Sequence, residues 1–177
     1  YPVNRIILMN TEEACFPAEI LKDHPKAEVH HVTRAEFDHG GTRDQGIRMS
    51  DADVVICMTQ DAMPADETLI EELVKPFDDP EVWAAYARQL PNEDCREVEK
   101  YTRSFNYPEQ SMVKTKEDLG RLGIKTFFCS NVCAAWRREK YLELGGFVKH
   151  TIFNEDMILA GTMIKQGGKI AYCAKAK

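Results

Sequence analysis

The sequence predicts an α/β domain built on a mixed, mostly parallel sheet that is flanked by helices. Apolar runs with strand character alternate along the chain with segments of helical periodicity, and this alternation is typical of strand–helix–strand units. The 177 residues, with a hydrophobic fraction of 44% and a charged fraction of 29%, suit one globular domain with a real core. No repeat or linker-like stretch divides the chain, so we expect a single domain over residues 1–177.

The first half of the chain predicts four strands and three helices. We expect strands at 3–10, 27–32, 53–59 and 81–89, and helices at 18–24, 42–50 and 66–77. Thr42 is the expected N-cap of the second helix. The third helix carries acidic residues in its first turn and an apolar face of Leu69, Leu73, Val74 and Phe77. The run VVICM in the third strand predicts burial on both faces.

The second half begins with a polar excursion over residues 91–125. Its aromatic residues Tyr101, Phe105 and Tyr107 favour an ordered, packed segment with short helices, such as EDLGRLG at 117–123. Residues 126–146 then predict a strand followed by a helix that ends at Gly145–Gly146. A helix at 154–168 and a strand at 169–175 complete the alternation.

Charge and composition exclude several classes of protein. The net charge of -6 argues against a nucleic-acid-binding protein, and it requires local cations or a bound metal wherever an anion binds. No apolar run approaches the roughly 20 residues that span a bilayer, and no signal peptide opens the chain. The six cysteines form no CxxC pair. We interpret them as free thiols in a reducing compartment, with a zinc site as the weaker alternative.

An aspartate follows directly on the most apolar strand. In an α/β sheet ligands bind beyond the carboxyl ends of the strands, so Asp61 could hold a hard cation such as Mg²⁺ against a phosphate. Thr59 and Gln60 could then donate hydrogen bonds to a nucleotide. The alternative is that Asp61 caps the helix that follows Pro64, and the sequence leaves both interpretations open.

Three other stretches could carry chemistry. In FDHGGTRDQG (37–46), Gly40 and Gly41 would let the backbone approach an anion and Arg43 could bind phosphate, although these residues alone favour an ordinary glycine turn. Neither a P-loop nor GxGxxG is present. Glu155 and Asp156 form an acidic helix start or, if buried, a source of one general base. Ser130 and Asn131 lie between apolar runs and need hydrogen-bond partners, which sugar hydroxyls or backbone groups could supply.

Taken in order, seven stretches of the chain resemble the family 2 glycosyltransferases, and within that family the bacterial rhamnosyltransferase-like branch. They are FDHGGTRDQG (37–46), MTQDAMP (58–64), YARQLP (86–91), RSFNYPEQS (103–111), GIKTFFCSNVCAAWRRE (123–139), LGGF (144–147) and FNEDMILAG (153–161). The resemblance covers nearly the whole chain and keeps the family's spacing.

This resemblance implies a GT-A fold, with a Rossmann-like sheet that binds a nucleotide-diphosphate sugar and a divalent metal, Mg²⁺ or Mn²⁺. Thr59-Gln60-Asp61 occupies the place of the family's Asp-x-Asp motif and keeps only its last acid, which implies Asp61 as the metal ligand. Asp156 resembles the catalytic base of inverting members, with Glu155 beside it near the acceptor.

The remaining roles implied by the resemblance divide between donor and acceptor. The donor nucleotide would be approached by Asp38, Gly40, Gly41, Arg43, Thr59 and Gln60, and the acceptor-side wall would contain Ser130 and Asn131. Family members begin with a further strand and helix of about 30 residues. We therefore expect the first βα unit to be missing here and the domain to be truncated at both ends.

The resulting hypothesis is an inverting transfer of a sugar, rhamnose being one candidate, from a dTDP- or UDP-sugar to a cell-surface glycan or lipid-linked acceptor. We expect this reaction in the cytoplasm or at the inner face of the membrane. The alternative is a non-catalytic fragment that binds a nucleotide or forms a homodimer through exposed sheet edges. A nucleotidyltransferase is disfavoured, because no Gly-rich signature carrying Arg or Lys accompanies the first strand.

Overall fold

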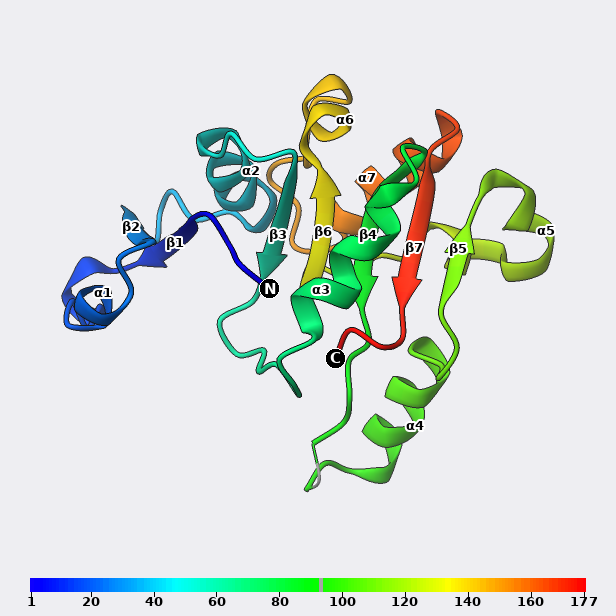
Figure 1. Cartoon of the computed structure of the whole chain (residues 1–177), viewed down its shortest axis with the longest axis horizontal. Helices are drawn as coiled ribbons and strands as arrows, with labels where there is room; N and C mark the ends of the chain where they lie inside the picture. Colours follow the sequence, from blue (N-terminus) through cyan, green and yellow to red (C-terminus); the bar gives the residue numbers. More distant parts are fainter. Residues whose placement is uncertain (93) are drawn as a thin grey trace.

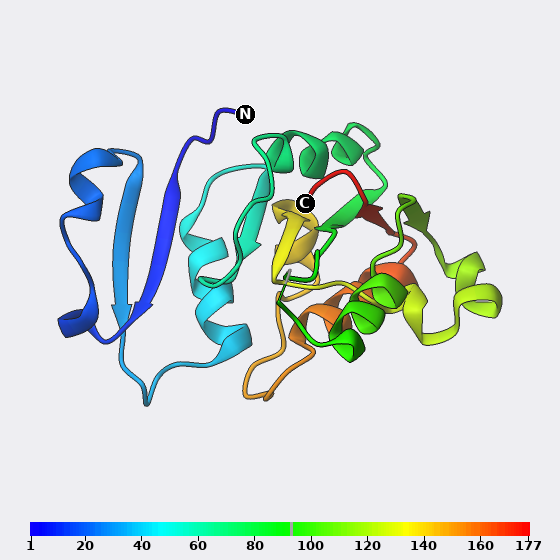
Figure 2. The same cartoon turned by 90° about the horizontal axis from the view of Figure 1, so that it is seen from below.

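The computed structural model describes residues 1–92 and 94–177, and its strands form two separate sheets. In the small sheet β1 (Ile6–Thr11) pairs in parallel with β2 (Ala27–Val32), with Ile6 opposite Ala27. The helix α1 (Ile20–Asp23) and a 3-10 turn, Glu13–Cys15, connect them. This pair lies beside the main sheet, with α2 (His39–Met49) between the two (Figures 1 and 2).

The main sheet has five strands in the order β3-β6-β4-β7-β5. Their bounds are β3 (Val54–Met58), β4 (Val82–Ala87), β5 (Met112–Lys114), β6 (Cys133–Arg137) and β7 (Lys169–Cys173). The remaining helices are α3 (Leu69–Val74), α4 (Glu97–Asn106), α5 (Leu119–Leu122), α6 (Arg138–Glu143) and α7 (Glu155–Lys165). Short 3-10 segments cover Lys75–Asp78, Lys116–Asp118 and Gly123–Phe127.

Helices cover both faces of the central strands. Along β4, β6 and β7, alternate side chains contribute to two core clusters on opposite faces of the sheet, as the pleat of a strand requires. The cluster that includes Leu69 and Leu73 packs under α3. The other contains the fully buried Trp136 and Tyr141 together with Met163 of α7. The α/β class with flanking helices is therefore confirmed.

The direction of the strands differs from the prediction. Only β4 and β7 pair in parallel within the main sheet, whereas β6 runs antiparallel to β3 and β4, and β5 runs antiparallel to β7. After β4 the chain does not cross back over the sheet through a helix. It continues into α4 and the antiparallel edge strand β5, and then returns to the end where β4 finishes, so β6 starts there and runs in the opposite direction (Figure 1). The expectation of mostly parallel pairing is wrong for this sheet.

Two local expectations also need correction. The helix α2 begins at His39 rather than after the glycines, and its N-cap is Asp38 rather than Thr42. Thr42 instead accepts a hydrogen bond from the Asp38 N–H through Oγ1, at 3.2 Å. The strand β3 contributes to both core clusters, with Val55 and Cys57 on one face and Val54 and Ile56 on the other, but its last residue, Met58, is exposed.

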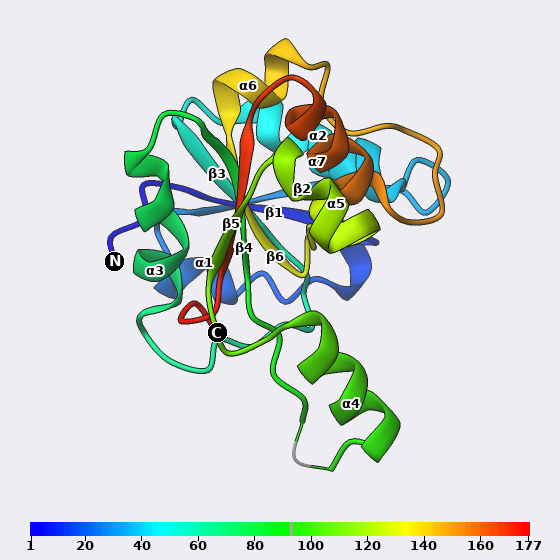
Figure 3. The same cartoon turned by 90° about the vertical axis from the view of Figure 1, so that its right-hand side faces the viewer.

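The excursion at 91–125 is ordered where the structure describes it, but it is less packed than predicted. Glu93 falls outside the described residues. Tyr107 is buried, whereas Tyr101 and Phe105 are exposed on α4 and stack on each other, with ring centroids 6.2 Å apart. The helix α4 projects from the end of the sheet where β4 and β7 finish (Figure 3).

Candidate active site

The candidate site lies where β3 and β4 end and β6 begins. Because β6 is antiparallel to both neighbours, its first residues lie beside the last residues of those strands. The N–H of Thr59, just after β3, donates to the carbonyl of Val132, just before β6, at 3.1 Å. This contact brings the segment Thr59–Asp61 next to Ser130 and Asn131. The topology therefore joins two stretches that the sequence analysis selected separately.

Asp156, in the first turn of α7, is held by two backbone N–H groups. Its Oδ2 accepts from the Asn131 N–H at 2.8 Å, and its Oδ1 accepts from the Met157 N–H at 2.7 Å. Burial raises the pKa of Asp156 and outweighs the N–H of Asn131, which lowers it; the charge of Glu155 adds a further rise. Burial, which raises the pKa of Asp156, therefore outweighs the helix N-terminus, which would lower it. Such a carboxylate is a stronger base than an exposed one.

Glu155 points into the protein and belongs to a buried polar network. Only 5% of its surface is exposed. Its Oε1 accepts from Arg43 Nη1 at 3.0 Å and from Asn131 Nδ2 at 3.1 Å, and the Asn131 Oδ1 accepts in turn from Trp136 Nε1 at 3.1 Å. The network links α2, α7 and the segment before β6. Since buried charges need such partners, Glu155 and Arg43 hold these three elements together around Asp156.

The segment from Asp38 to Arg43 forms the first turn of α2, and its polar groups are largely engaged within the protein. The Asp38 carboxylate accepts from the Gly41 N–H at 2.5 Å and from the His150 N–H at 2.9 Å. A side chain at Gly40 would place its Cβ 2.2 Å from the carbonyl oxygen of Val148. The absence of a side chain at Gly40 is therefore required by the loop before α7.

Thr59, Gln60 and Asp61 form a turn directly after β3, closed by the Ala62 N–H donating to the Thr59 carbonyl at 3.2 Å. Gln60 and Asp61 are exposed, and no hydrogen bond or ion pair joins the Asp61 carboxylate to another described residue. Asp61 does not cap the next helix, because α3 begins at Leu69. The capping interpretation is therefore excluded.

The chemistry of Asp61 fits a metal that the protein holds by a single side chain. Groups of three or more His, Cys, Asp or Glu side chains suited to a metal do not occur among the residues that the structure describes. Mg²⁺ is often held by only one or two carboxylates together with substrate phosphates. The Thr59 hydroxyl next to Asp61 is buried and lacks a hydrogen-bond partner within the described part of the chain. This turn therefore has a polar group that can still form a hydrogen bond.

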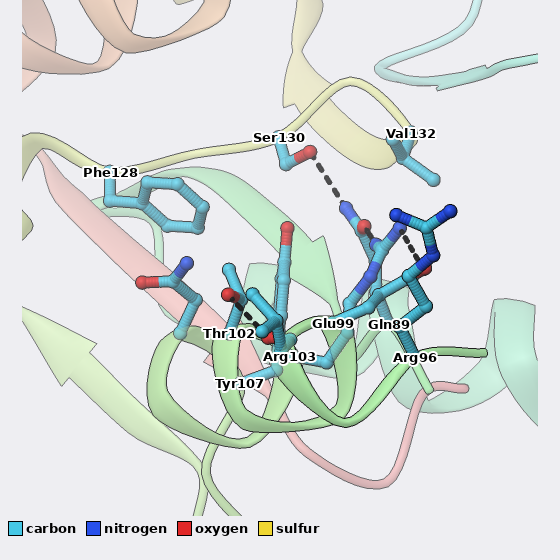
Figure 4. Close-up of a pocket in the computed structure, with 11 residues that line it drawn as sticks. Gln89, Arg96, Glu99, Thr102, Arg103, Tyr107, Phe128, Ser130 and Val132 are labelled. Carbon is cyan, nitrogen blue, oxygen red and sulfur yellow. Dashed lines mark hydrogen bonds and ion pairs between the residues drawn. The ribbon is translucent and has the colours of Figure 1, made fainter. Parts of the chain in front are cut away.

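An open cavity of about 700 Å³ lies beside Ser130, between α4 and the segment at 128–132 (Figure 4). Gln89 follows β4 and donates through Nε2 to Ser130 Oγ at 2.9 Å, and its Oε1 accepts from Arg103 of α4. Neither Gln89 nor Arg103 was among the predicted site residues. The only available signal was their inclusion in YARQLP and RSFNYPEQS.

The cavity and Asp156 are neighbours. Tyr107 lines the cavity, and burial raises its pKa, with the negative charge of Asp156 among the smaller contributions. Ser130, on the opposite wall, immediately precedes the Asn131 N–H that binds Asp156. A half-buried carboxylate of raised pKa is thus hydrogen-bonded to the residue that follows Ser130, and Ser130 lines an open cavity large enough for a small-molecule ligand.

Solved structures of glycosyltransferases share this fold. The mannosyltransferase PcManGT from Pyrobaculum calidifontis, in complex with GDP-Man and Mn²⁺, superimposes with a TM-score of 0.62 at 16% identity, over 94% of this chain and 47% of its own. TarS from S. aureus, in complex with UDP-GlcNAc, gives a TM-score of 0.68 at 11% identity, over 97% of this chain and 47% of its own. The fold is therefore that of the GT-A glycosyltransferases.

The sequence comparisons identify the family. The model of glycosyl transferase family 2 matches residues 1–145. The chain is 42% identical over 177 residues to the O-antigen chain rhamnosyltransferase RfbN of Salmonella typhimurium, covering 99% of this chain and 56% of the relative. It is 44% identical over 146 residues to the O-antigen chain rhamnosyltransferase WbaN of Salmonella anatum, covering 82% of this chain and 46% of the relative. The chain belongs to glycosyltransferase family 2 and spans about half the length of these relatives.

Proposed function

We propose that the protein transfers a sugar from a nucleotide-diphosphate donor to a hydroxyl group of a glycan acceptor, with inversion at the anomeric carbon and with Asp156 as the general base. The observation that carries this proposal is the setting of Asp156. Each carboxylate oxygen accepts one backbone N–H, burial raises the pKa of the carboxyl group, and the neighbouring residue of its partner Asn131, Ser130, lines an open cavity. The carboxylate is thereby oriented and basic, as proton abstraction from a hydroxyl requires.

In the reaction, Asp156 takes the proton of the acceptor hydroxyl as that oxygen forms a bond to the anomeric carbon. The bond between the anomeric carbon and the phosphate oxygen breaks, and the nucleotide diphosphate leaves with the electron pair. Asp61 would hold a divalent metal, Mg²⁺ or Mn²⁺, which supplies positive charge to the departing diphosphate. Glu155 and Arg43 act through the buried network that positions Asn131, whose N–H orients the base.

The donor and acceptor follow from the relatives. Rhamnose is the proposed sugar, because both curated relatives are named rhamnosyltransferases. A dTDP- or UDP-sugar is the proposed donor, and the TarS complex with UDP-GlcNAc and the PcManGT complex with GDP-Man and Mn²⁺ support the use of a nucleotide sugar with a metal. The proposed acceptor is a cell-surface or lipid-linked glycan, and we place the reaction in the cytoplasm or at the inner face of the membrane. Among the described residues no helix is both long and apolar enough to cross a bilayer.

Asp156→Asn tests this function in the full-length protein. It keeps the shape of the side chain but removes the base, so we expect transfer to fall by about 10²- to 10⁴-fold while nucleotide binding is retained. In the wild type the rate should fall on the acidic side at a pH above the ordinary range of an aspartate, because burial raises the pKa of Asp156. The exposed Asp51→Asn is the matched control and should leave both readouts unchanged. Unchanged transfer in Asp156→Asn would refute the assignment, and nucleotide binding without transfer in the wild type would favour the non-catalytic alternative.

A further inference from the structure

The helix α4 buries none of its side chains. Its apolar residues Val98, Tyr101 and Phe105 follow the spacing of one helix face, yet they are 77%, 70% and 58% exposed. A helix of a globular domain normally turns such a face toward the core. The core of this protein therefore does not explain the position of α4.

A few contacts hold α4 along one side. The Arg103 guanidinium donates to the side-chain oxygen of Gln89, and Tyr107 at the C-cap of the helix is buried. Lys125 donates to the Phe105 carbonyl at 3.0 Å and lies 3.2 Å from the centre of the Phe105 ring. These contacts fix the helix at a distance from the segment at 128–132, and the space between them is the cavity of about 700 Å³.

The walls of this cavity combine hydroxyl, amide and aromatic groups with little net charge. Its polar lining comprises Gln89, Arg96, Glu99, Thr102, Arg103, Asn106 and Ser130, so the charged side chains are two arginines and one glutamate. The Arg103 guanidinium lies 3.5 Å from the Glu99 carboxylate, which offsets its charge. Figure 4 shows these side chains converging on the cavity from α4 and from the opposite segment. Arg96 is then the one lining cation outside an ion pair among the described residues. A single such cation suits a neutral, polyhydroxylated ligand better than a diphosphate, which would call for clustered, unpaired cations.

The position of the cavity near Asp156 indicates what its ligand does in the reaction. Ser130 lies in its wall, and the N–H of the next residue, Asn131, donates to the Asp156 carboxylate at 2.8 Å. We propose that the cavity walled by α4 holds the terminal sugar of the glycan acceptor and presents one of its hydroxyls to Asp156. This inference rests on the proposed function and names the residues that would recognise the acceptor, with Thr102, Gln89 and Ser130 as the polar contacts. The rest of the bound glycan then extends from the cavity along the exposed face of α4.

The test compares two tryptophan substitutions on the same helix in the full-length protein. Thr102→Trp fills the cavity, whereas Ser104→Trp adds the same side chain at a position outside it. Binding of the methyl α-glycosides of rhamnose, galactose, mannose and glucose is followed by saturation-transfer NMR, and binding of UDP and dTDP is measured on the same samples. We expect at least one glycoside to bind the wild type and Ser104→Trp, and to bind Thr102→Trp at least about tenfold more weakly, a loss of about 1.4 kcal/mol. Nucleotide affinity should be equal in all three proteins.

Two results would overturn the inference, namely equal glycoside binding by both variants or no glycoside binding by the wild type. Thermal unfolding of both variants shows whether Thr102→Trp is folded, and retained nucleotide binding provides a second check. If nucleotide binding and the dependence of transfer on Asp156 persist while Thr102→Trp has no effect, the assignment of the cavity is wrong and the proposed function stands. If the wild type binds neither nucleotide nor glycoside, the proposed function falls as well.

Discussion

The buried residue Lys114 leads us to expect that the stability of the protein depends strongly on pH. It lies in β5 with 1% of its surface exposed, and its ammonium donates to the Tyr86 hydroxyl at 3.2 Å and to the carbonyls of Lys125, at 3.3 Å, and Phe128. No carboxylate forms an ion pair with it among the described residues. Burial therefore lowers the pKa of Lys114 from 10.5 to about 8.

This shift determines the sign and size of the effect. Between pH 8 and 10.5 the unfolded chain carries a proton on Lys114 that the folded protein has lost, so the free energy of unfolding rises with pH. Below pH 8 both states are protonated, and the full penalty of burying the charge, about 3 kcal/mol, applies. About 2 kcal/mol of this penalty is relieved on going from about pH 7 to about pH 9.5.

The assay is urea unfolding of the wild type and of Lys114→Met at these two pH values. Methionine keeps much of the side-chain volume but does not titrate. The free energy of unfolding of the wild type minus that of the variant should increase by about 2 kcal/mol with the rise in pH. Ionisation of cysteines in the unfolded chain cancels in this difference, because both proteins have the same cysteines. The exposed Lys116→Met is the control and should show no such increase, and a difference between wild type and Lys114→Met that is constant with pH would refute the reasoning.

Two further predictions concern the packing around the site, and urea unfolding measures both. Gly40→Ala should lower the free energy of unfolding by about 1–3 kcal/mol, because its Cβ would lie 2.2 Å from the Val148 carbonyl oxygen. Gly120→Ala is the control and should be neutral or slightly stabilising, because its Cβ would meet nothing within 4 Å. Equal urea midpoints for the two variants would contradict this prediction. Arg43→Met should cost about 3–5 kcal/mol, because it leaves the buried Glu155 carboxylate without its cation. Adding Glu155→Gln to Arg43→Met should then cost less than the sum of the two single changes, and strict additivity would show that the pair is not coupled.

The sequence predicted the elements of the fold well wherever an apolar run or a helical period was long. The strands β2, β3, β4 and β7 and the helix α7 lie within the ranges expected for them, and β1 extends one residue beyond its expected range. Strand direction could not be predicted in this way, because an apolar run such as that of β6 is the same whichever way the strand runs. The boundaries of α2 were missed for a local reason. Asp38 was assigned to a loop, whereas its carboxylate accepts the Gly41 N–H and starts the helix.

The sequence was less informative about residues whose environment comes from distant segments. Lys114 stands in the short run MVK, within the polar excursion at 91–125, and nothing in that run indicated a buried lysine. Its burial depends on Tyr86 of β4 and on the turn at 125–128, neither of which lies near it in sequence. The aromatic pair Tyr101 and Phe105 was mispredicted in the opposite sense, since hydrophobic composition favoured packing and α4 exposes both rings.

The candidate site contains a residue that the sequence could identify, in an environment that the sequence could not predict. The chemistry of the site depends on that environment. Asp156 could be selected as an acid at a helix start, where the helix N-terminus alone would lower its pKa. Its pKa is raised because it is half-buried beneath the segment that precedes β6, where Asn131 meets it. That segment reaches Asp156 only because β6 starts at the end of the sheet where β3 and β4 finish. A parallel β6 would begin at the opposite end of the sheet and leave the first turn of α7 uncovered, so the antiparallel strand is what buries this N-terminal acid and raises its pKa.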